Sequence, residues 1–247
     1  MCDLFALSAA TNYSAPKSLP IFARRSSANM DGWGIGFFRK NHAHVEKSGS
    51  SAYHEGRFHD SFQRLARVVA SRFIIAHVRF RTSGPVDECH AHPFVLHLEG
   101  QDWVFAHNGK APAIESYRSE GVRLEEAASD SARTFEFLLD GISNRYYSVG
   151  DVPGLFKAVA HTSKQLVEAY PGNYNYLLSN GRVLFAFSNH RYFLILKGSE
   201  KLERGLLLTT VSQGLSEENW TRIVRKNESI GILLAIAGSD ILLMADI

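Results

Sequence analysis

The sequence predicts an α+β protein in which stacked β-sheets are covered by helices. Two observations lead to this fold class. Two segments with apolar residues at helical spacing lie in the middle of the 247-residue chain, and many short strand-like runs flank them on both sides. No internal repeat or low-complexity linker divides the chain, so we expect a single domain over residues 1–247.

The first half alternates strand-like runs with polar and glycine-rich loops. A first strand is expected over residues 3–8, and a hairpin over residues 32–47 turns at residues 40–42. Capping residues and apolar β-branched runs indicate further elements. These are a helix over 16–25 with Ser14 near its start, a helix over 61–70 capped by Asp60, and strands over 73–78 and 103–107, the latter ending at a turn formed by Asn108-Gly109.

The second half contains the two strongest helix signals and then strands only. One helix follows Asp130, and the other ends at Pro171-Gly172. Their apolar faces comprise Phe135, Leu138, Leu139 and Ile142 in the first helix, and Phe156, Val159, Ala160, Ser163, Val167 and Tyr170 in the second. The expected strands are 174–179, 183–188, 192–197, 206–210, 230–236 and 241–244, with a hairpin turn at Asn180-Gly181.

Composition excludes several classes of protein. The net charge of +2 provides no strong field for nucleic acid or for an anionic membrane. Two cysteines, Cys2 and Cys89, are too few for a disulfide framework and are typical of a reducing compartment. The chain has no signal-peptide pattern and no apolar run long enough to span a membrane. We therefore expect a cytoplasmic protein with neither a nucleic-acid nor a membrane partner.

The position of Cys2 is the first indication of chemistry. Aminopeptidases remove an initiator methionine when the next side chain is small, which would leave the thiol of Cys2 beside an α-amino group. An α-amine titrates near pH 8 and a thiol near pH 8.5, so the amine can accept the thiol proton at neutral pH. Cys2 is thus a candidate N-terminal nucleophile. The alternative is a small buried residue at the start of the first strand.

Attack on a carbonyl also needs donors for the developing oxyanion. The Asn108 side-chain amide and the Gly109 backbone N–H lie side by side in the sequence and could both point at that oxygen. The alternative for an Asn-Gly pair is a simple hairpin turn.

Two charged residues could hold a substrate. Arg79 stands at the exit of the strand over 73–78 and could bind a carboxylate with its planar fork. Asp130 could bind an ammonium group. The alternatives are a surface cation for Arg79 and an ordinary helix N-cap for Asp130.

Two further clusters allow more than one interpretation. The glycines in Asp31-Gly32-Trp33-Gly34-Ile35-Gly36 could let the backbone approach closely and seat the N-terminal residue, or could serve tight sheet packing. The histidines His90, His92, His97 and His107 raise the question of a metal site. Their spacing matches no known metal motif, so structural roles are favoured over metal binding.

The order of these motifs is more specific than any one of them. They are Met1-Cys2, Asp31-Gly32-Trp33-Gly34, His77-Val78-Arg79-Phe80-Arg81-Thr82-Ser83-Gly84, His90-Ala91-His92-Pro93-Phe94, His107-Asn108-Gly109 and Ser129-Asp130. In this order the chain resembles the class II, or N-terminal nucleophile, glutamine amidotransferases, and in particular the stand-alone type with an Asp-Gly-Trp-Gly motif. The resemblance is specific from residue 1 to about residue 140 and rests beyond that on the order of strands and helices.

The resemblance implies a four-layer αββα sandwich of the N-terminal nucleophile hydrolase type. It also implies that Cys2, freed of Met1, attacks the side-chain amide of glutamine, releases ammonia and forms a γ-glutamyl thioester. The implied site residues are Asn108 and Gly109 for the oxyanion, Arg79 for the α-carboxylate, Asp130 for the α-amino group, Phe80 and Thr82 for the pocket wall, and His92 and His107 as structural supports. No metal and no cofactor are expected.

The chain also departs from the family pattern. Arg81 stands where a small residue is usual, so it could narrow the pocket, add a cation or point to solvent. No second catalytic domain is apparent, so an ammonia-accepting enzyme would be a separate partner if there is one. Three alternatives stay open: a hydrolase of another γ-glutamyl amide or peptide, a regulatory module without catalysis, and a metal hydrolase that uses His90 and His92. The sequence does not indicate the oligomeric state.

Overall fold

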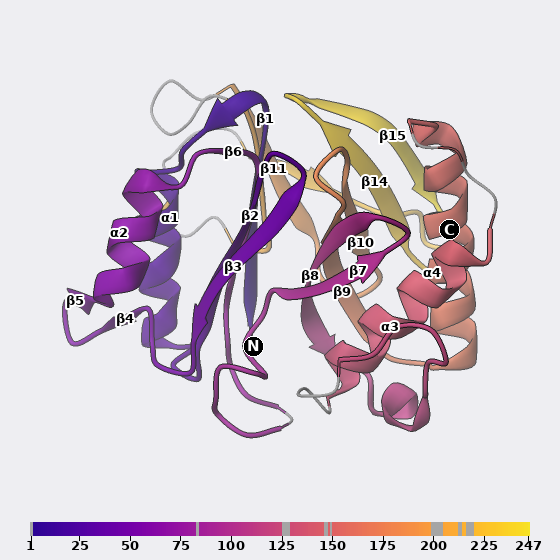
Figure 1. Ribbon diagram of the computed structural model, residues 1–247, viewed down its shortest axis with the longest axis horizontal. Helices are drawn as coiled ribbons and strands as arrows, with labels where there is room; N and C mark the ends of the chain where they lie inside the picture. The colour runs from indigo at the N-terminus through magenta and orange to yellow at the C-terminus, as the bar shows by residue number, and fades with distance from the viewer. Residues whose placement is uncertain are drawn as a thin grey trace.

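The protein is a sandwich of two β-sheets with helices on both outer faces. The computed structural model describes residues 2–82, 84–124, 129–145, 148, 150–198, 205–211, 214–215 and 220–247. Figure 1 shows the four layers in order: α1 (Ser18–Ala23) and α2 (Asp60–Val68), the two sheets, then α3 (Asp130–Ser143) and α4 (Val152–Ala169). The predicted αββα architecture is confirmed.

The first sheet carries the start of the chain at its centre. Its strand order is β13-β11-β12-β1-β6-β2-β3, and β1 pairs antiparallel with both β6 and β12. The strands are β1 (Asp3–Tyr13), β2 (Trp33–Arg39), β3 (His42–Ser48), β6 (Ser71–Val78), β11 (Phe193–Lys197), β12 (Leu206–Thr209) and β13 (Thr221–Ile223). Cys2 therefore immediately precedes a central strand.

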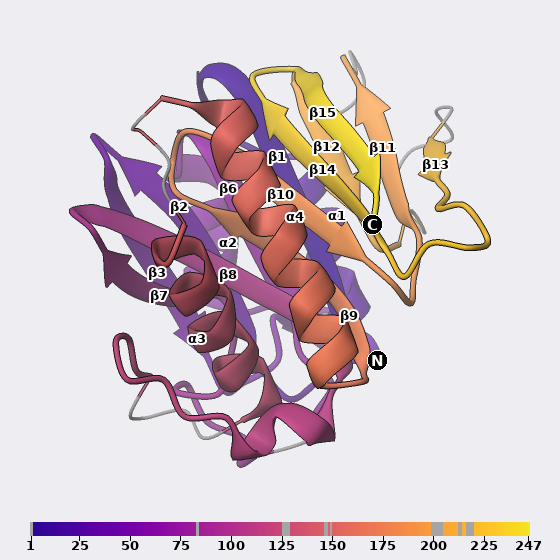
Figure 2. The ribbon, with the colours of Figure 1, turned by 90° about the vertical axis from the view of Figure 1, so that its right-hand side faces the viewer.

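The second sheet has the order β15-β14-β10-β9-β8-β7, and α3 and α4 lie across its outer face, as Figure 2 shows. Its strands are β7 (Phe94–Leu98), β8 (Gln101–Lys110), β9 (Asn173–Ser179), β10 (Leu184–Ser188), β14 (Ile232–Ala237) and β15 (Asp240–Asp246). The remaining elements are the short pair β4 (Tyr53–His54) and β5 (Arg57–Phe58), and the 3-10 turns Arg24–Ser27 and Pro112–Ser116.

Alternation along the strands divides the apolar residues among three core layers. On β1, Leu4 and Ala6 are buried between the two sheets, whereas Phe5 packs under the helices α1 and α2. On β8, Val104 faces the first sheet and Phe105 packs against α3. A shift of either strand by one residue would exchange these faces, so burial on both sides fixes the register.

One local prediction is wrong: Asn108-Gly109 does not form a turn. Strand β8 continues to Lys110, with Asn108 opposite Asn175 and Gly109 opposite Tyr174 on β9. The physical reason is the pairing partner: β9 extends far enough to satisfy the backbone of these residues, which outweighs the local turn preference of Asn-Gly.

Helix starts also differ from expectation. Asp60 and Asp130 are each the first residue of their helix, and neither is the cap. At α3 the cap is Ser129, whose side chain accepts a hydrogen bond from the Ala132 N–H. Strands β4, β5, β7 and β13 were not expected. Within the described residues, no helix combines the length and the apolar character needed to cross a membrane.

Candidate active site

Six of the residues expected in the site line one narrow pocket with a volume of about 30 Å³. They are Cys2, Arg79, Phe80, Thr82, Gly109 and Asp130, and His90, His92, His107, Ser129 and Ser131 complete the lining. Antiparallel pairing of β1 with β6 places Asp3 opposite Val78, so the start of β1 meets the end of β6. This pairing is what brings Cys2 next to the segment that begins at Arg79.

The Cys2 thiol is held by the backbone of Phe80. The Phe80 N–H donates to Sγ over 3.2 Å, and Sγ–H donates to the Phe80 carbonyl oxygen over 3.2 Å. Burial raises the pKa of the Cys2 thiol, while the hydrogen bond from Phe80 and the charge of Arg79 oppose that rise. A thiol with a raised pKa needs a base for its activation. Met1 lies outside the described residues.

Arg79 is a buried cation fixed by hydrogen bonds to two backbone carbonyl oxygens. Its backbone N–H donates to the Gly32 carbonyl oxygen (2.8 Å), and its Nη1 donates to the Pro85 carbonyl oxygen (2.7 Å). The residue is 5 % exposed, so the alternative of a surface cation does not apply. Burial lowers the pKa of Arg79, and the neighbouring Cys2 and Asp87 act in the opposite direction. A guanidinium remains charged under these conditions and can bind a carboxylate.

Asp130 lies across the pocket at the start of α3. Its Oδ2 accepts from the Ala111 N–H (2.9 Å), its Oδ1 accepts from the Ser131 N–H (2.8 Å), and the residue is 4 % exposed. Carboxylate oxygens have more than one acceptor position each, so both can still accept from an ammonium group. A cation-binding and an anion-binding side chain therefore line the pocket together with the thiol.

Asn108 reaches the nucleophile from the second sheet. Its Nδ2 donates a short hydrogen bond to the Cys2 carbonyl oxygen, and its Oδ1 has no hydrogen-bond partner among the residues described. One Nδ2 hydrogen serves Cys2, and the second is left for another acceptor. Gly109 is required for the close approach of β9, because a Cβ there would lie 1.8 Å from the Asn173 carbonyl oxygen.

The glycine-rich motif serves packing around this loop. A Cβ on Gly34 would lie 2.2 Å from the His92 carbonyl oxygen. Asp31 supports the loop after Arg79, since its N–H donates to the Arg79 carbonyl and its Oδ2 accepts from the Arg81 N–H (2.7 Å). The packing interpretation of this motif therefore agrees with the contacts, and Asp31 adds a support for the pocket loop.

Three buried histidines lie at the pocket: His92 and His107 line it, and His77 packs against His92. The ring centroids of His77 and His92 are 4.5 Å apart, and His107 bonds through its ring nitrogens to Ser131 Oγ and the Asn173 carbonyl. Burial lowers the pKa of all three, and that of His77 falls to about 3. They are therefore neutral imidazoles near pH 7.

The other two histidines considered for a metal have carboxylate partners. His90 Nδ1 lies 2.7 Å from Asp87, and His97 Nδ1 lies 2.8 Å from Asp102. Among the residues that the structure describes, no three or more His, Cys, Asp or Glu side chains are grouped as metal ligands.

Sequence reasoning missed a charged cluster directly behind the nucleophile. Asp3 is buried and accepts hydrogen bonds from Arg25, Asn29, Arg191 and Thr210. Arg191 also donates to the Cys2 carbonyl oxygen over 3.0 Å. The sequence offered one signal for Asp3, because an acidic residue directly follows the candidate nucleophile in a strand that is otherwise apolar at its start. Arg191 has no comparable local signal.

Sequence comparison relates most of the chain to a known family of proteins. A sequence model of the family described as class-II glutamine amidotransferases matches residues 1–201. A protein of Haemophilus influenzae, provisionally named a glutamine amidotransferase, is 27 % identical over 194 residues. That match covers 75 % of this chain and 62 % of the relative, so this chain matches less than two thirds of that protein's length.

Solved structures share the fold at low sequence identity. One from Pseudomonas aeruginosa, described as a predicted glutamine amidotransferase, aligns with a TM-score of 0.66 at 19 % identity, over 98 % of this chain and 100 % of its own. The glutamine phosphoribosylpyrophosphate amidotransferase of B. subtilis aligns with a TM-score of 0.63 at 14 % identity, over 99 % of this chain and 49 % of its own. At these identities the likeness concerns the fold alone.

Proposed function

We propose that this chain, which belongs to the class-II glutamine amidotransferase family, hydrolyses the side-chain amide of glutamine with Cys2 as the nucleophile. The observation that carries the proposal is the meeting of three groups at one pocket. These are the thiol of Cys2, the buried guanidinium of Arg79 and the buried carboxylate of Asp130.

Glutamine fits this set of charges. It carries a carboxylate and an ammonium group on one carbon and an amide at the far end. Arg79 would bind the carboxylate and Asp130 the ammonium group, which directs the amide carbon toward Cys2 Sγ. Phe80 and Thr82 would complete the wall around the substrate chain.

The proposed reaction begins after Met1 has been removed. The α-amine of Cys2 accepts the thiol proton, and Sγ attacks the amide carbon to form a tetrahedral oxyanion. The second Nδ2 hydrogen of Asn108 and the backbone N–H of Gly109 would stabilise that oxyanion. The protonated amine then donates to the leaving nitrogen, so ammonia departs and a γ-glutamyl thioester remains. Water, deprotonated by the same amine, attacks the thioester and releases glutamate and the thiol.

Ammonia would be used by a separate protein, if it is used for synthesis. The two large sheets, their covering helices and the short β4–β5 pair account for the described strands and α-helices from β1 to β15. We therefore propose an acceptor enzyme as a partner rather than an acceptor site within these residues.

Intact-mass analysis and substrate profiling test the proposal together. The purified protein should lack Met1, release glutamate from glutamine, and take up one equivalent of a glutamine-mimicking electrophile. Cys2→Ala should abolish both turnover and labelling, while the matched Cys89→Ala should retain both. Labelling at Cys89 would contradict the assignment. Faster glutamate release from other γ-glutamyl amides or peptides than from glutamine would replace glutamine as the substrate.

A further inference from the structure

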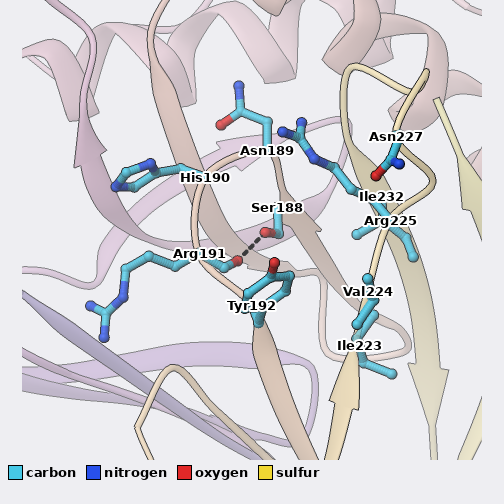
Figure 3. Close-up of a pocket in the computed structure, with 10 residues that line it drawn as sticks. All are labelled: Ser188, Asn189, His190, Arg191, Tyr192, Ile223, Val224, Arg225, Asn227 and Ile232. Atoms are coloured by element: carbon cyan, nitrogen blue, oxygen red, sulfur yellow. Dashed lines mark hydrogen bonds between the residues drawn. The ribbon is translucent and has the colours of Figure 1, made fainter.

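Arg191 lies on the turn where the chain crosses from the second sheet to the first. The turn joins β10 to β11 and forms one wall of a pocket with a volume of about 190 Å³. Figure 3 shows that the Arg191 side chain points away from Tyr192 and Arg225, which line that pocket. Its side-chain hydrogen bonds are instead made with Cys2, Asp3 and the Thr210 carbonyl oxygen.

The Arg191 guanidinium bridges three acceptors behind the pocket lined by Cys2. Nη1 donates to the Cys2 carbonyl oxygen (3.0 Å) and to Asp3 Oδ1 (3.1 Å), and Nη2 donates to the Thr210 carbonyl oxygen (3.2 Å). The Arg191 side chain is 24 % exposed and that of Asp3 is 1 % exposed. A planar fork with fixed donor directions suits three acceptors in this arrangement better than a lysine would.

The turn itself is fixed by Asn175 on β9. The Arg191 N–H donates to Asn175 Oδ1 (2.9 Å), and Asn175 Nδ2 donates to the Arg191 carbonyl oxygen (2.7 Å). Ser188 Oγ also donates to the Arg191 carbonyl, the bond drawn in Figure 3. Asn175 is fully buried and lies opposite Asn108 in the β8–β9 pairing. The backbone of Arg191 is therefore held at a set position relative to Asn108.

The Cys2 carbonyl matters because an N-terminal residue has no preceding peptide group. Phe80 holds the Cys2 thiol, and the Cys2 backbone is held at its carbonyl oxygen, where two donors meet: Asn108 Nδ2 from β8 and Arg191 Nη1 from the crossing turn. Together they set the rotation of the Cys2 backbone, and hence the directions of its α-amine and of Sγ.

We propose that Arg191 is a positioning residue that orients the nucleophile by binding the Cys2 carbonyl oxygen and Asp3. This inference rests on the proposed role of Cys2. It adds a residue that is not among those lining the pocket of Cys2 and that acts through Cys2. A misplacement of about 1 Å can cost on the order of 100-fold in rate, so the effect on turnover should be measurable.

Arg191→Met and Arg191→Lys test the proposal, with Arg25→Met as the matched control. Arg25 binds the other oxygen of the same carboxylate, with Nε 3.2 Å from Asp3 Oδ2, and no hydrogen bond joins Arg25 to Cys2 among the described residues. We expect Arg191→Met to lower kcat for glutamine at least tenfold with KM within threefold of the unchanged protein. Arg191→Lys keeps the charge beside Asp3 and should still lose kcat, whereas Arg25→Met should stay within twofold.

The rate of alkylation by iodoacetamide gives a second readout that does not need glutamine turnover. Labelling of Cys2 should slow at least threefold in Arg191→Met while labelling of Cys89 is unchanged, with all variants compared at equal folded fraction by circular dichroism. Equal Cys2 labelling in Arg191→Met and Arg25→Met would overturn the inference, as would a raised KM with unchanged kcat. If the unchanged protein alkylates at Cys2 but does not hydrolyse glutamine, the proposed function fails and the alkylation ratio still decides the role of Arg191.

Discussion

Asp3 directly follows the proposed nucleophile, and replacing it by asparagine should lower the free energy of unfolding substantially. The Asp3 carboxylate is 1 % exposed and accepts from four donors. Two of these donors are the guanidinium groups of Arg25 and Arg191. An amide at this position keeps one acceptor oxygen, turns a donor toward the existing donors and removes the anion that both cations share.

The expected loss follows from the burial of the three groups. Breaking a fully buried ion pair by removing one partner costs about 3–5 kcal/mol. The Arg25 and Arg191 side chains are 28 % and 24 % exposed, so water can compensate them in part. We therefore expect a loss of about 3 kcal/mol in the free energy of unfolding, at the lower end of that range. For a protein of this size, this corresponds to a fall in Tm of about 6–12 °C.

Thermal and urea unfolding followed by circular dichroism measure this loss, with Asp240→Asn as the matched control. Asp240 pairs with Lys197 at 3.4 Å, but its side chain is 74 % exposed and that of Lys197 is 53 % exposed. Exposed pairs of this kind contribute about 0–1 kcal/mol, so the control should change little. If Asp3→Asn unfolds at the same temperature as Asp240→Asn, the four donors do not stabilise the fold and the reasoning from burial is refuted.

Two other changes test the neighbouring strands and the buried histidines. Gly109→Ala places a Cβ 1.8 Å from a β9 carbonyl oxygen, so it should lower the free energy of unfolding by about 3 kcal/mol and abolish turnover. The control is Gly121→Ala, whose Cβ would meet only a carboxylate oxygen at 3.1 Å and which should be nearly neutral. Equal melting temperatures of the two variants would contradict this prediction. For His77, the folded pKa of about 3 lies below the unfolded value of about 6.5. Between these two pH values the unfolded chain binds a proton at His77 that the folded chain does not bind. The free energy of unfolding therefore falls as the pH drops from about 6.5 toward 3. His77→Leu should reduce that slope by up to about 1.4 kcal/mol per pH unit, measured by urea unfolding at pH 7, 6 and 5; an unchanged slope would show that His77 does not cause it.

Much of the fold could be predicted because its strands are buried in regular patterns. The strand expected over 73–78 is found as β6, the one expected over 174–179 as β9, and the hairpin over 32–47 as β2 and β3. Strands β7 and β13 escaped prediction for a physical reason. Each is short and lies at the edge of its sheet, so pairing with a single neighbour defines it more than its own apolar pattern does.

Some residues of the candidate site could be predicted from short sequence motifs, whereas others depend on contacts between distant parts of the chain. The substrate-binding residues proposed here sit in short motifs whose order resembles a known family, and that resemblance selected them; these residues line one pocket. Asp3 and Arg191 were missed because their contact joins residues 188 positions apart. No spacing rule in a single sequence encodes such a contact; it exists only once β10 and β11 have entered different sheets.

The groups that hold Cys2 in place come from different parts of the fold. Cys2 is attached to the first sheet through β1, whereas Asn108 comes from β8 of the second sheet. Arg191 lies on the chain segment that connects the two sheets. The Cys2 carbonyl therefore receives both of its donors only when the sheets are stacked in the native register. Phe80, which follows β6 of the first sheet, holds the thiol, but the Cys2 backbone is fixed only when both carbonyl donors are in place. Full nucleophile reactivity should therefore appear with sheet stacking during folding, after β1 and β6 have paired.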